Sequence, residues 1–391
     1  MALQQIINGR IITPEGIIEG GSLLWSEGII REIRSDSTPA SDAIVLDAEG
    51  CFVAPGCIDM HIHGGDGHDF MEATPEAFDA IRYAHALHGT TSMLATLAVS
   101  PRDVIERCVE ICDFGLSTGE GAHLLGLHLE GNYLNPIYKG AQDPTYITPP
   151  DPDEYVTLLN RTQCIRRWSA APELPGATDF ARYARLKGVL VALAHTAADN
   201  KEVTEGFQAG FTHATHFYNA MSGMHKEGMY KHEGTIESVL VNDGITIELI
   251  ADGIHVPSTL LRLAWKVKGT SRTALVTDAM SVSAPVDIHE SHRVFDPRVI
   301  VEDDVCVMAD HSALAGSIAT CDRLIRTMVQ QAGIPLTEAV KMASDTPAHI
   351  LHIEDRKGSL RVGKDADIIV FDDTINIHHT ILNGNLLPRP V

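Results

Sequence analysis

The sequence Pro55-Gly-Cys-Ile-Asp-Met-His-Ile-His-Gly-Gly65 places two histidines, His61 and His63, at the end of a short apolar run. Side chains at positions i and i+2 of a β-strand point to the same side. Two imidazoles on one side, followed by a Gly-Gly pair where the strand must turn, are plausible metal ligands. Such a pair is also common in cores and on surfaces, because this chain holds 20 histidines.

From residue 58 onward, short apolar segments alternate with longer segments of helical pattern, which is typical of repeated βα units. The predicted strands are 58–63, 92–97, 124–130, 167–171, 190–195, 212–217, 246–250 and 273–278. The predicted helices between them include 75–88, 101–114, 178–187, 200–208 and 258–266. Eight parallel strands, each followed by a helix, predict a TIM barrel. A doubly wound sheet is the alternative.

The two ends of the chain have the pattern of short strands with turns. Helices are predicted at 321–332 and 336–344, before the C-terminal strands. Neither end has enough strands to cover a core alone. We therefore expect residues 1–54 and 356–391 to form one small β-sandwich domain beside a barrel domain of residues 55–355. Residues 281–317 are expected to form a loop region.

Six side chains of ligand type end five of the predicted strands, which favours the barrel over the doubly wound sheet. They are His61, His63, Glu130, His195, His216 and Asp278. The active site of a TIM barrel sits at the carboxyl ends of its strands, so these side chains are expected to converge on one rim. A single histidine at a strand end is more often a hydrogen-bonded core residue. Six together predict a divalent metal site of nitrogen and oxygen ligands.

A bound metal with an open position lowers the pKa of its water to about 7. Asp278 is the remaining carboxylate and follows the last strand, so it is the candidate that takes the proton and passes it to a leaving group. This chemistry predicts hydrolysis of an amide, an ester or a similarly polarised carbon.

Composition excludes several other classes of protein. The formal net charge of −22 argues against a nucleic-acid or anionic-membrane partner. Neither a signal peptide nor an apolar stretch near the roughly 20 residues of a membrane span is recognised. Seven scattered cysteines without a C-x-x-C pair indicate reduced thiols and a cytoplasmic location.

At this point the sequence resembles the amidohydrolase superfamily and, within it, the N-acetylglucosamine-6-phosphate deacetylase family, over nearly the whole chain. Besides Pro55–Gly65, the motifs that carry the resemblance are His128-Leu-Glu-Gly131, Lys139-Gly-Ala141, Ala171-Pro-Glu173, Ala194-His-Thr196, Thr215-His-Phe-Tyr-Asn-Ala-Met221, Ala251-Asp-Gly-Ile-His-Val256, Val276-Thr-Asp-Ala279, Leu314-Ala-Gly-Ser317 and Gly363-Lys-Asp-Ala-Asp367. The Thr-His-x-x-Asn-Ala-Met and Asp-Gly-Ile-His motifs are specific to the deacetylases. The H-x-H and G-K-D-A-D motifs mark only the superfamily.

The resemblance implies a metal held by Glu130, His195 and His216, and a second metal at His61 and His63 with Glu130 bridging. One or two ions are therefore expected, Zn²⁺ first and Fe²⁺ as an alternative. It also implies that Asp278 activates water and protonates the amine of an N-acetyl amino sugar 6-phosphate. A homodimer is expected by resemblance alone.

The resemblance further implies how the sugar phosphate is held. His255 would contact the sugar and help polarise the acetyl carbonyl, Asn219 and Ala220 would hold the phosphate, and the turn of Leu314, Ala315 and Gly316 would line the pocket. N-acetylglucosamine-6-phosphate is the leading substrate. N-acetylgalactosamine-6-phosphate, an unphosphorylated N-acetyl sugar and another N-acyl compound are the alternatives.

Three departures from the family pattern concern the substrate pocket. The family usually has Pro-Phe where this chain has Asn132-Tyr133, and histidine where it has Gln142, which we carry over as a substrate contact. The family arginine that grips the phosphate, often from the neighbouring subunit, aligns with Lys231, in a segment (222–233) that differs in length. Lysine neutralises a phosphate but lacks the bidentate fork of arginine. The other interpretation of this basic segment is a solvated loop.

Overall fold

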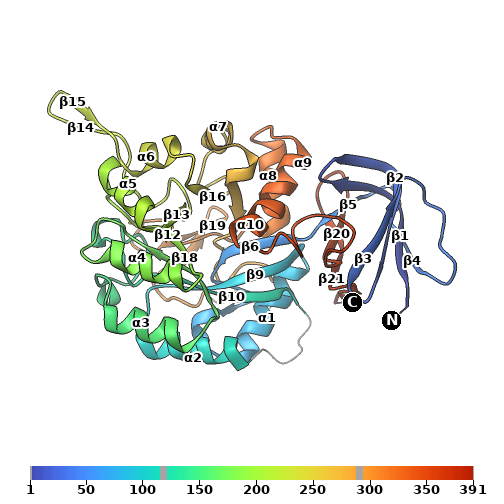
Figure 1. Ribbon diagram of the computed structural model, residues 1–391, viewed down its shortest axis with the longest axis horizontal. Helices are drawn as coiled ribbons and strands as arrows, with labels where there is room; N and C mark the ends of the chain where they lie inside the picture. Colours follow the sequence, from blue (N-terminus) through green and yellow to red (C-terminus); the bar gives the residue numbers. More distant parts are fainter. Residues whose placement is uncertain (1, 115–120, 288–293, 391) are drawn as a thin grey trace.

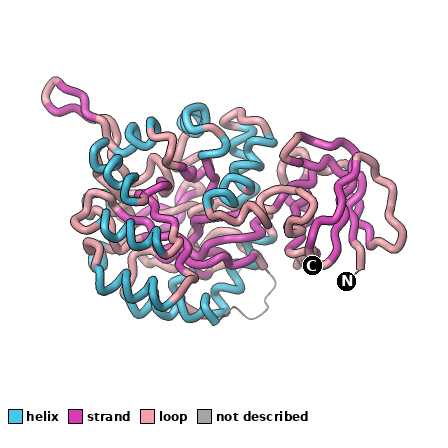
Figure 2. The backbone as a smooth tube through the Cα atoms, in the orientation of Figure 1, coloured by secondary structure: helices cyan, strands magenta, loops and turns pink. Residues whose placement is uncertain are grey.

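The computed structural model describes residues 2–114, 121–287 and 294–390, and consists of two units lying side by side (Figure 1). The larger unit is a barrel of strands surrounded by helices. The smaller unit is built from strands and holds both ends of the chain (Figure 2). In the described part of the chain, no helix is long and apolar enough to span a lipid bilayer.

The barrel is one sheet of eight strands in the order β17-β16-β13-β12-β11-β10-β9-β6, and each paired neighbour is parallel. The strands are β6 (Cys57–Ile62), β9 (Thr90–Leu97), β10 (His123–Glu130), β11 (Ile165–Ala170), β12 (Leu190–Leu193), β13 (Phe211–Ala214), β16 (Thr246–Ile250) and β17 (Thr273–Val276). The N–H of Asp278 donates to the carbonyl of His61 at 2.8 Å, which brings the last strand back to the first. The predicted TIM barrel is confirmed.

A helix follows each barrel strand, and two more helices come after the eighth. The helices are α1 (Pro75–Ala86), α2 (Arg102–Phe114), α3 (Pro152–Arg161), α4 (Ala177–Leu186), α5 (Asn200–Ala209), α6 (Thr235–Val241), α7 (Ser258–Lys268), α8 (Cys321–Gln330), α9 (Leu336–Ala343) and α10 (Asp345–Ile350). Local sequence explains several starts. The Thr74 side chain caps α1, with proline at its first position, and Asp199 and Glu202 form a capping box on α5.

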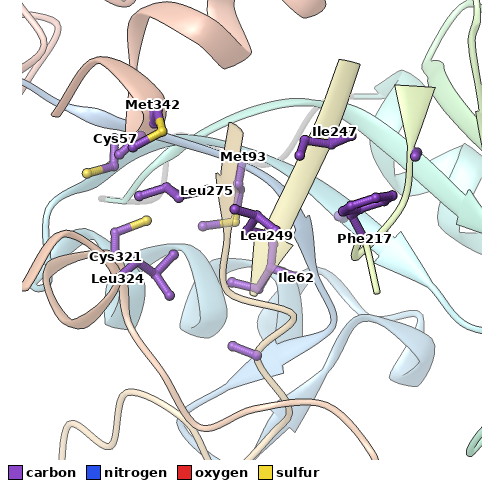
Figure 3. Close-up of a cluster of buried hydrophobic side chains, with 14 of the residues drawn as sticks. Cys57, Ile62, Met93, Phe217, Ile247, Leu249, Leu275, Cys321, Leu324 and Met342 are labelled. Atoms are coloured by element: carbon purple, nitrogen blue, oxygen red, sulfur yellow. The ribbon is translucent and has the colours of Figure 1, made fainter. Parts of the chain in front are cut away.

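The main core lies between the strands and the helices. Every residue of β6 and β9 is buried, as expected for parallel strands covered on both faces. Figure 3 shows part of this core, in which Leu249 and Leu275 of the barrel lie near Leu324 of α8. This packing fixes the strands and therefore the positions of the side chains at their carboxyl ends.

The smaller unit joins the two ends of the chain, as predicted. Its strands are β1 (Gln4–Thr13), β2 (Gly16–Ser26), β3 (Ile29–Arg34), β4 (Ile44–Asp47), β5 (Phe52–Pro55), β20 (Ile368–Phe371), β21 (Ile377–Leu382) and β22 (Asn385–Leu386). β20 pairs antiparallel with β5, so the C-terminal strands continue the N-terminal sheet. Ile6, Leu23 and Val53 pack with Ile368 in its core.

Hairpins lie in the expected loop region 281–317 and in the segment 222–233, for which a solvated loop was one of two interpretations. Within 281–317, β18 (Val299–Glu302) and β19 (Val305–Met308) pair antiparallel, and residues 288–293 lie outside the described residues. The expectation failed because the turn is Asp303-Asp304, both with positive φ, rather than a glycine-containing pair. Within 222–233, β14 (His225–Glu227) pairs with β15 (Tyr230–His232), and this hairpin stands away from the barrel (Figure 1).

Candidate metal centre and active site

The six side chains at the strand ends meet at one rim of the barrel and form two groups that share Glu130. The first group is Glu130, His195 and His216, and the second is His61, His63 and Glu130. Glu130 Oε1 lies 3.1 Å from His195 Nε2 and 2.9 Å from His216 Nε2. Its other oxygen, Oε2, lies 3.2 Å from His63 Nε2 and 3.6 Å from His61 Nε2.

Asp278 belongs to the same cluster. Its Oδ1 lies 3.3 Å from His63 Nε2 and 3.4 Å from His61 Nε2. The structure therefore brings together every residue that the sequence assigned to the metal or to proton transfer. It places Asp278 on the side of the cluster that holds His61 and His63.

The hydrogen bonds of two imidazoles show that the cluster suits a cation. His195 Nδ1 lies 2.7 Å from the carbonyl of Tyr138, and His61 Nδ1 lies 2.9 Å from a carboxylate oxygen of Glu248. These acceptors require a hydrogen on each Nδ1, so in the neutral ring each Nε2 carries a lone pair. Those Nε2 atoms face other imidazole nitrogens at 3.2–3.3 Å and the carboxylate of Glu130. Converging lone pairs on nitrogen and oxygen are the donor set of a divalent metal.

The electrostatics of the cluster also favour positive charge there. Burial lowers the pKa of His61, but the carboxylates of Asp278 and Glu130 outweigh it and raise that pKa to about 9. Burial raises the pKa of Glu130, yet the surrounding imidazoles hold it well below its usual range. The Glu130 carboxylate therefore stays ionised at neutral pH, as metal ligation requires.

Three of the six residues have left-handed backbone: φ is 45° at His195, 28° at His216 and 49° at Asp278. The predicted strands ran through these residues, whereas β12, β13 and β17 each end two residues earlier. Positive φ is uncommon outside glycine and is found in functional sites that the surrounding structure enforces. The turn at each strand end directs the side chain into the rim.

A buried layer beneath the rim was missed from the sequence. The Glu248 carboxylate accepts hydrogen bonds from Arg167 at 2.6 and 2.8 Å, from His61 Nδ1 and from His213, and also from the N–H of His216. Arg167 and Glu248 are fully buried. The sequence signal that could have revealed this layer is a charged residue in each of the apolar segments 167–171 and 246–250. Charged residues are almost never buried unless they are paired.

Asp59 provides a second support. Its carboxylate accepts hydrogen bonds from the Thr277 hydroxyl and, at 3.2 Å, from the N–H of His61. It therefore links the strand that carries His61 to the residue before Asp278.

The rim opens into a cavity of about 900 Å³. It is lined by all but one of the residues expected to contact substrate, namely Gln142, Asn219, Ala220, His255, Leu314, Ala315 and Gly316. Lys139 and Arg298 also line the cavity. Neither was assigned to the site from the sequence, although Lys139 belongs to the Lys139-Gly-Ala141 motif. His255 Nδ1 is held at 2.7 Å by Asp252, which fixes the ring at the cavity wall.

Lys231 does not lie at the cavity. It is exposed on β15, in the hairpin that stands away from the barrel (Figure 2). The lysine was placed by counting residues in a segment of altered length, and the hairpin carries it outward. Within a single copy of the chain, Lys231 does not contact the cavity lining.

A TIM barrel whose strand ends gather histidines and carboxylates beside a cavity defines the class of metal-dependent hydrolases. The amidohydrolase family model matches residues 52–387. The chain belongs to the amidohydrolase family.

Relatives of this chain extend over nearly its whole length. It is 32% identical to an N-acetylglucosamine-6-phosphate deacetylase of Bacillus subtilis (strain 168), covering 96% of this chain and 95% of the relative. It is 31% identical to an N-acetylgalactosamine-6-phosphate deacetylase of Escherichia coli O157:H7, covering 96% and 97%. The crystal structure of N-acetylglucosamine-6-phosphate deacetylase from Pasteurella multocida superposes with a TM-score of 0.90 at 27% identity, covering 99% and 100%.

Proposed function

We propose that this protein hydrolyses the N-acetyl group of an amino sugar 6-phosphate, with N-acetylglucosamine-6-phosphate as the first substrate. The products are acetate and the amino sugar phosphate. The observation that carries the proposal is the position of Asp278, whose carboxylate lies beside both histidines of one metal group at the floor of a cavity large enough for a sugar phosphate.

A divalent ion bound at the cluster supplies a polarised acetyl carbonyl and water of lowered pKa. Glu130, His195 and His216 would hold one ion, and His61 and His63 with Glu130 would hold a second. We propose Zn²⁺, with Fe²⁺ as the alternative. Metal analysis of the purified protein decides between one ion and two.

Asp278 performs the proton transfers. Its carboxylate takes a proton from the water whose oxygen forms a bond to the acetyl carbon, and then gives that proton to the nitrogen as the carbon–nitrogen bond breaks. Burial raises the pKa of Asp278, but His61 and His63 outweigh it and lower that pKa, so the carboxylate is ready to accept. His255, oriented by Asp252, contacts the sugar and helps to polarise the acetyl carbonyl.

The phosphate is held by groups from two copies of the chain in this proposal. Asn219 and Ala220 line the cavity, three and four residues after His216, and the turn of residues 314–316 lines it as well. Lys231 supplies a cation to the cavity of a neighbouring copy, since its own hairpin points outward. We therefore propose a homodimer. We also propose a cytoplasmic location, on the ground of the seven scattered cysteines. In each copy, residues 55–355 form the hydrolytic domain and residues 1–54 and 356–391 form the sandwich domain.

Acetate release by the metal-loaded protein tests the function. The panel contains N-acetylglucosamine and N-acetylgalactosamine, each with and without the 6-phosphate. We expect kcat/KM to be highest for N-acetylglucosamine-6-phosphate. Lys231→Ala should raise KM for the phosphorylated sugars more than for the unphosphorylated ones. No acetate from any of the four sugars would overturn the proposal.

N-acetylgalactosamine-6-phosphate is the second candidate. The E. coli O157:H7 relative carries that name at 31% identity, close to the 32% of the B. subtilis relative. Gln142, in place of the histidine usual in the family, changes a group at the cavity wall. A higher kcat/KM for the galacto epimer in the same panel would select this substrate.

A further inference from the structure

The side chain of Gln142 bridges the segment after β9 and the shared carboxylate of the metal cluster. Its Nε2 lies 2.8 Å from Glu130 Oε2, and its Oε1 accepts a hydrogen bond of 2.9 Å from the N–H of Val99. A backbone N–H can only donate and an ionised carboxylate can only accept. The two partners therefore fix which end of the amide faces Glu130.

This contact distinguishes the two oxygens of Glu130. Oε1 faces His195 and His216, whereas Oε2 faces His61, His63 and the Gln142 amide. The last torsion of a glutamate is broad, so the plane of the carboxylate is held by its neighbours. The amide donor holds Oε2 toward the His61 and His63 side.

We infer that Gln142 is a positioning residue that sets the plane of the Glu130 carboxylate, so that one oxygen serves each histidine pair and the ion at His61 and His63 is retained. The inference rests on the two-ion centre of the proposed function. It does not depend on which compound is hydrolysed. It also gives a role to the residue at which this chain departs from the histidine usual in its family.

The chain offers a matched control for this contact. Asn132 also carries a buried amide that holds the segment after β9, through bonds of 3.0 Å from the N–H of Ser100 and 2.9 Å to its carbonyl. The hydrogen bonds of its side chain go to Ser100, not to Glu130. Asn132→Ala therefore loosens the same segment and leaves the Gln142–Glu130 hydrogen bond in place.

The experiment is a metal titration of the full-length chain after chelation. Zn²⁺ is titrated into the wild-type protein, Gln142→Ala and Asn132→Ala by calorimetry, and bound metal is counted by elemental analysis. Ligand-orienting contacts typically change metal affinity by about 10–100-fold. We expect Gln142→Ala to weaken the second ion by this factor and to leave the first within about threefold, since Oε1 keeps both of its imidazole neighbours.

Gln142→Met keeps the length of the side chain without the donor, and it answers the question if the alanine variant does not fold. Electron paramagnetic resonance of the Co²⁺ protein provides a second readout, because two adjacent ions couple and one ion does not. Wild-type affinity for both ions in Gln142→Ala, an equal loss in Asn132→Ala, or a single ion in the wild-type protein would overturn the inference. Absence of acetate release with the metal pattern intact would remove the proposed substrate only.

Discussion

The buried carboxylate of Glu248 allows a quantitative test of how the metal cluster is supported. Glu248→Ala leaves the Arg167 guanidinium fully buried without the carboxylate that it contacts at 2.6 and 2.8 Å. Removing one partner of a buried ion pair costs about 3–5 kcal/mol, because the remaining charge is desolvated and uncompensated. We expect the free energy of unfolding to fall by that amount.

The same substitution acts on the metal. His61 loses the acceptor at its Nδ1, which lies 2.9 Å from Glu248, so the tautomer that presents Nε2 to the cluster is no longer fixed. Loss of such a partner typically weakens metal binding by about 10–100-fold. Both effects follow from one carboxylate, so they should appear together in this variant.

Urea unfolding followed by circular dichroism measures the stability, and elemental analysis after dialysis measures the bound metal. The control is Glu205→Ala, on the exposed side of α5, where the carboxylate lies 3.8 Å from Lys201. Such a surface substitution should change the free energy of unfolding by less than about 0.5 kcal/mol. A loss below about 1 kcal/mol for Glu248→Ala, with normal metal content, would refute the reasoning.

Three further predictions concern the site and its surroundings. Asp278→Asn should lower kcat by at least about 100-fold, since an amide cannot accept the proton, while the ion at Glu130, His195 and His216 stays bound. Acetate release measures kcat, and metal analysis measures the bound ion. Retained turnover would remove Asp278 from the mechanism. Burial lowers the pKa of His85 to about 3, so between pH 6.5 and 3 the unfolded chain binds a proton that the folded chain does not, and stability falls as the pH drops. At pH 5 the loss in the free energy of unfolding amounts to about 2 kcal/mol, and the variant His85→Gln should not show this loss when its urea unfolding is measured at pH 5 and at neutral pH. An identical pH dependence of stability in the variant would contradict the prediction. Chelation should lower the Tm, and Zn²⁺ at about 100 times its Kd should restore about 2.7 kcal/mol of stability; a Tm that does not respond to Zn²⁺ would argue against a resident ion.

The sequence by itself determined the barrel and the composition of its rim. Alternation of apolar and helical segments is a local property, and the carboxyl ends of parallel strands must meet at one edge whatever the details of packing. His61, Glu130 and His195 could therefore be assigned to one place from their position at the end of an apolar segment.

The tertiary structure decided what lies behind and around that rim. Arg167 and Glu248 are 81 residues apart, on β11 and β16, and β13 and β12 lie between these two strands in the sheet. The two side chains meet because the sheet curves into a barrel, and no local pattern encodes which side chains then face each other. The bond from Gln142 to Glu130 depends in the same way on how a loop folds over the strand end. The alignment of Lys231 with a phosphate contact did not say where the residue lies, and the structure places it on an outward hairpin, because chain length does not fix the direction of a loop. Local periodicity specifies which face of an element is buried, whereas contacts between distant side chains arise only when the elements pack.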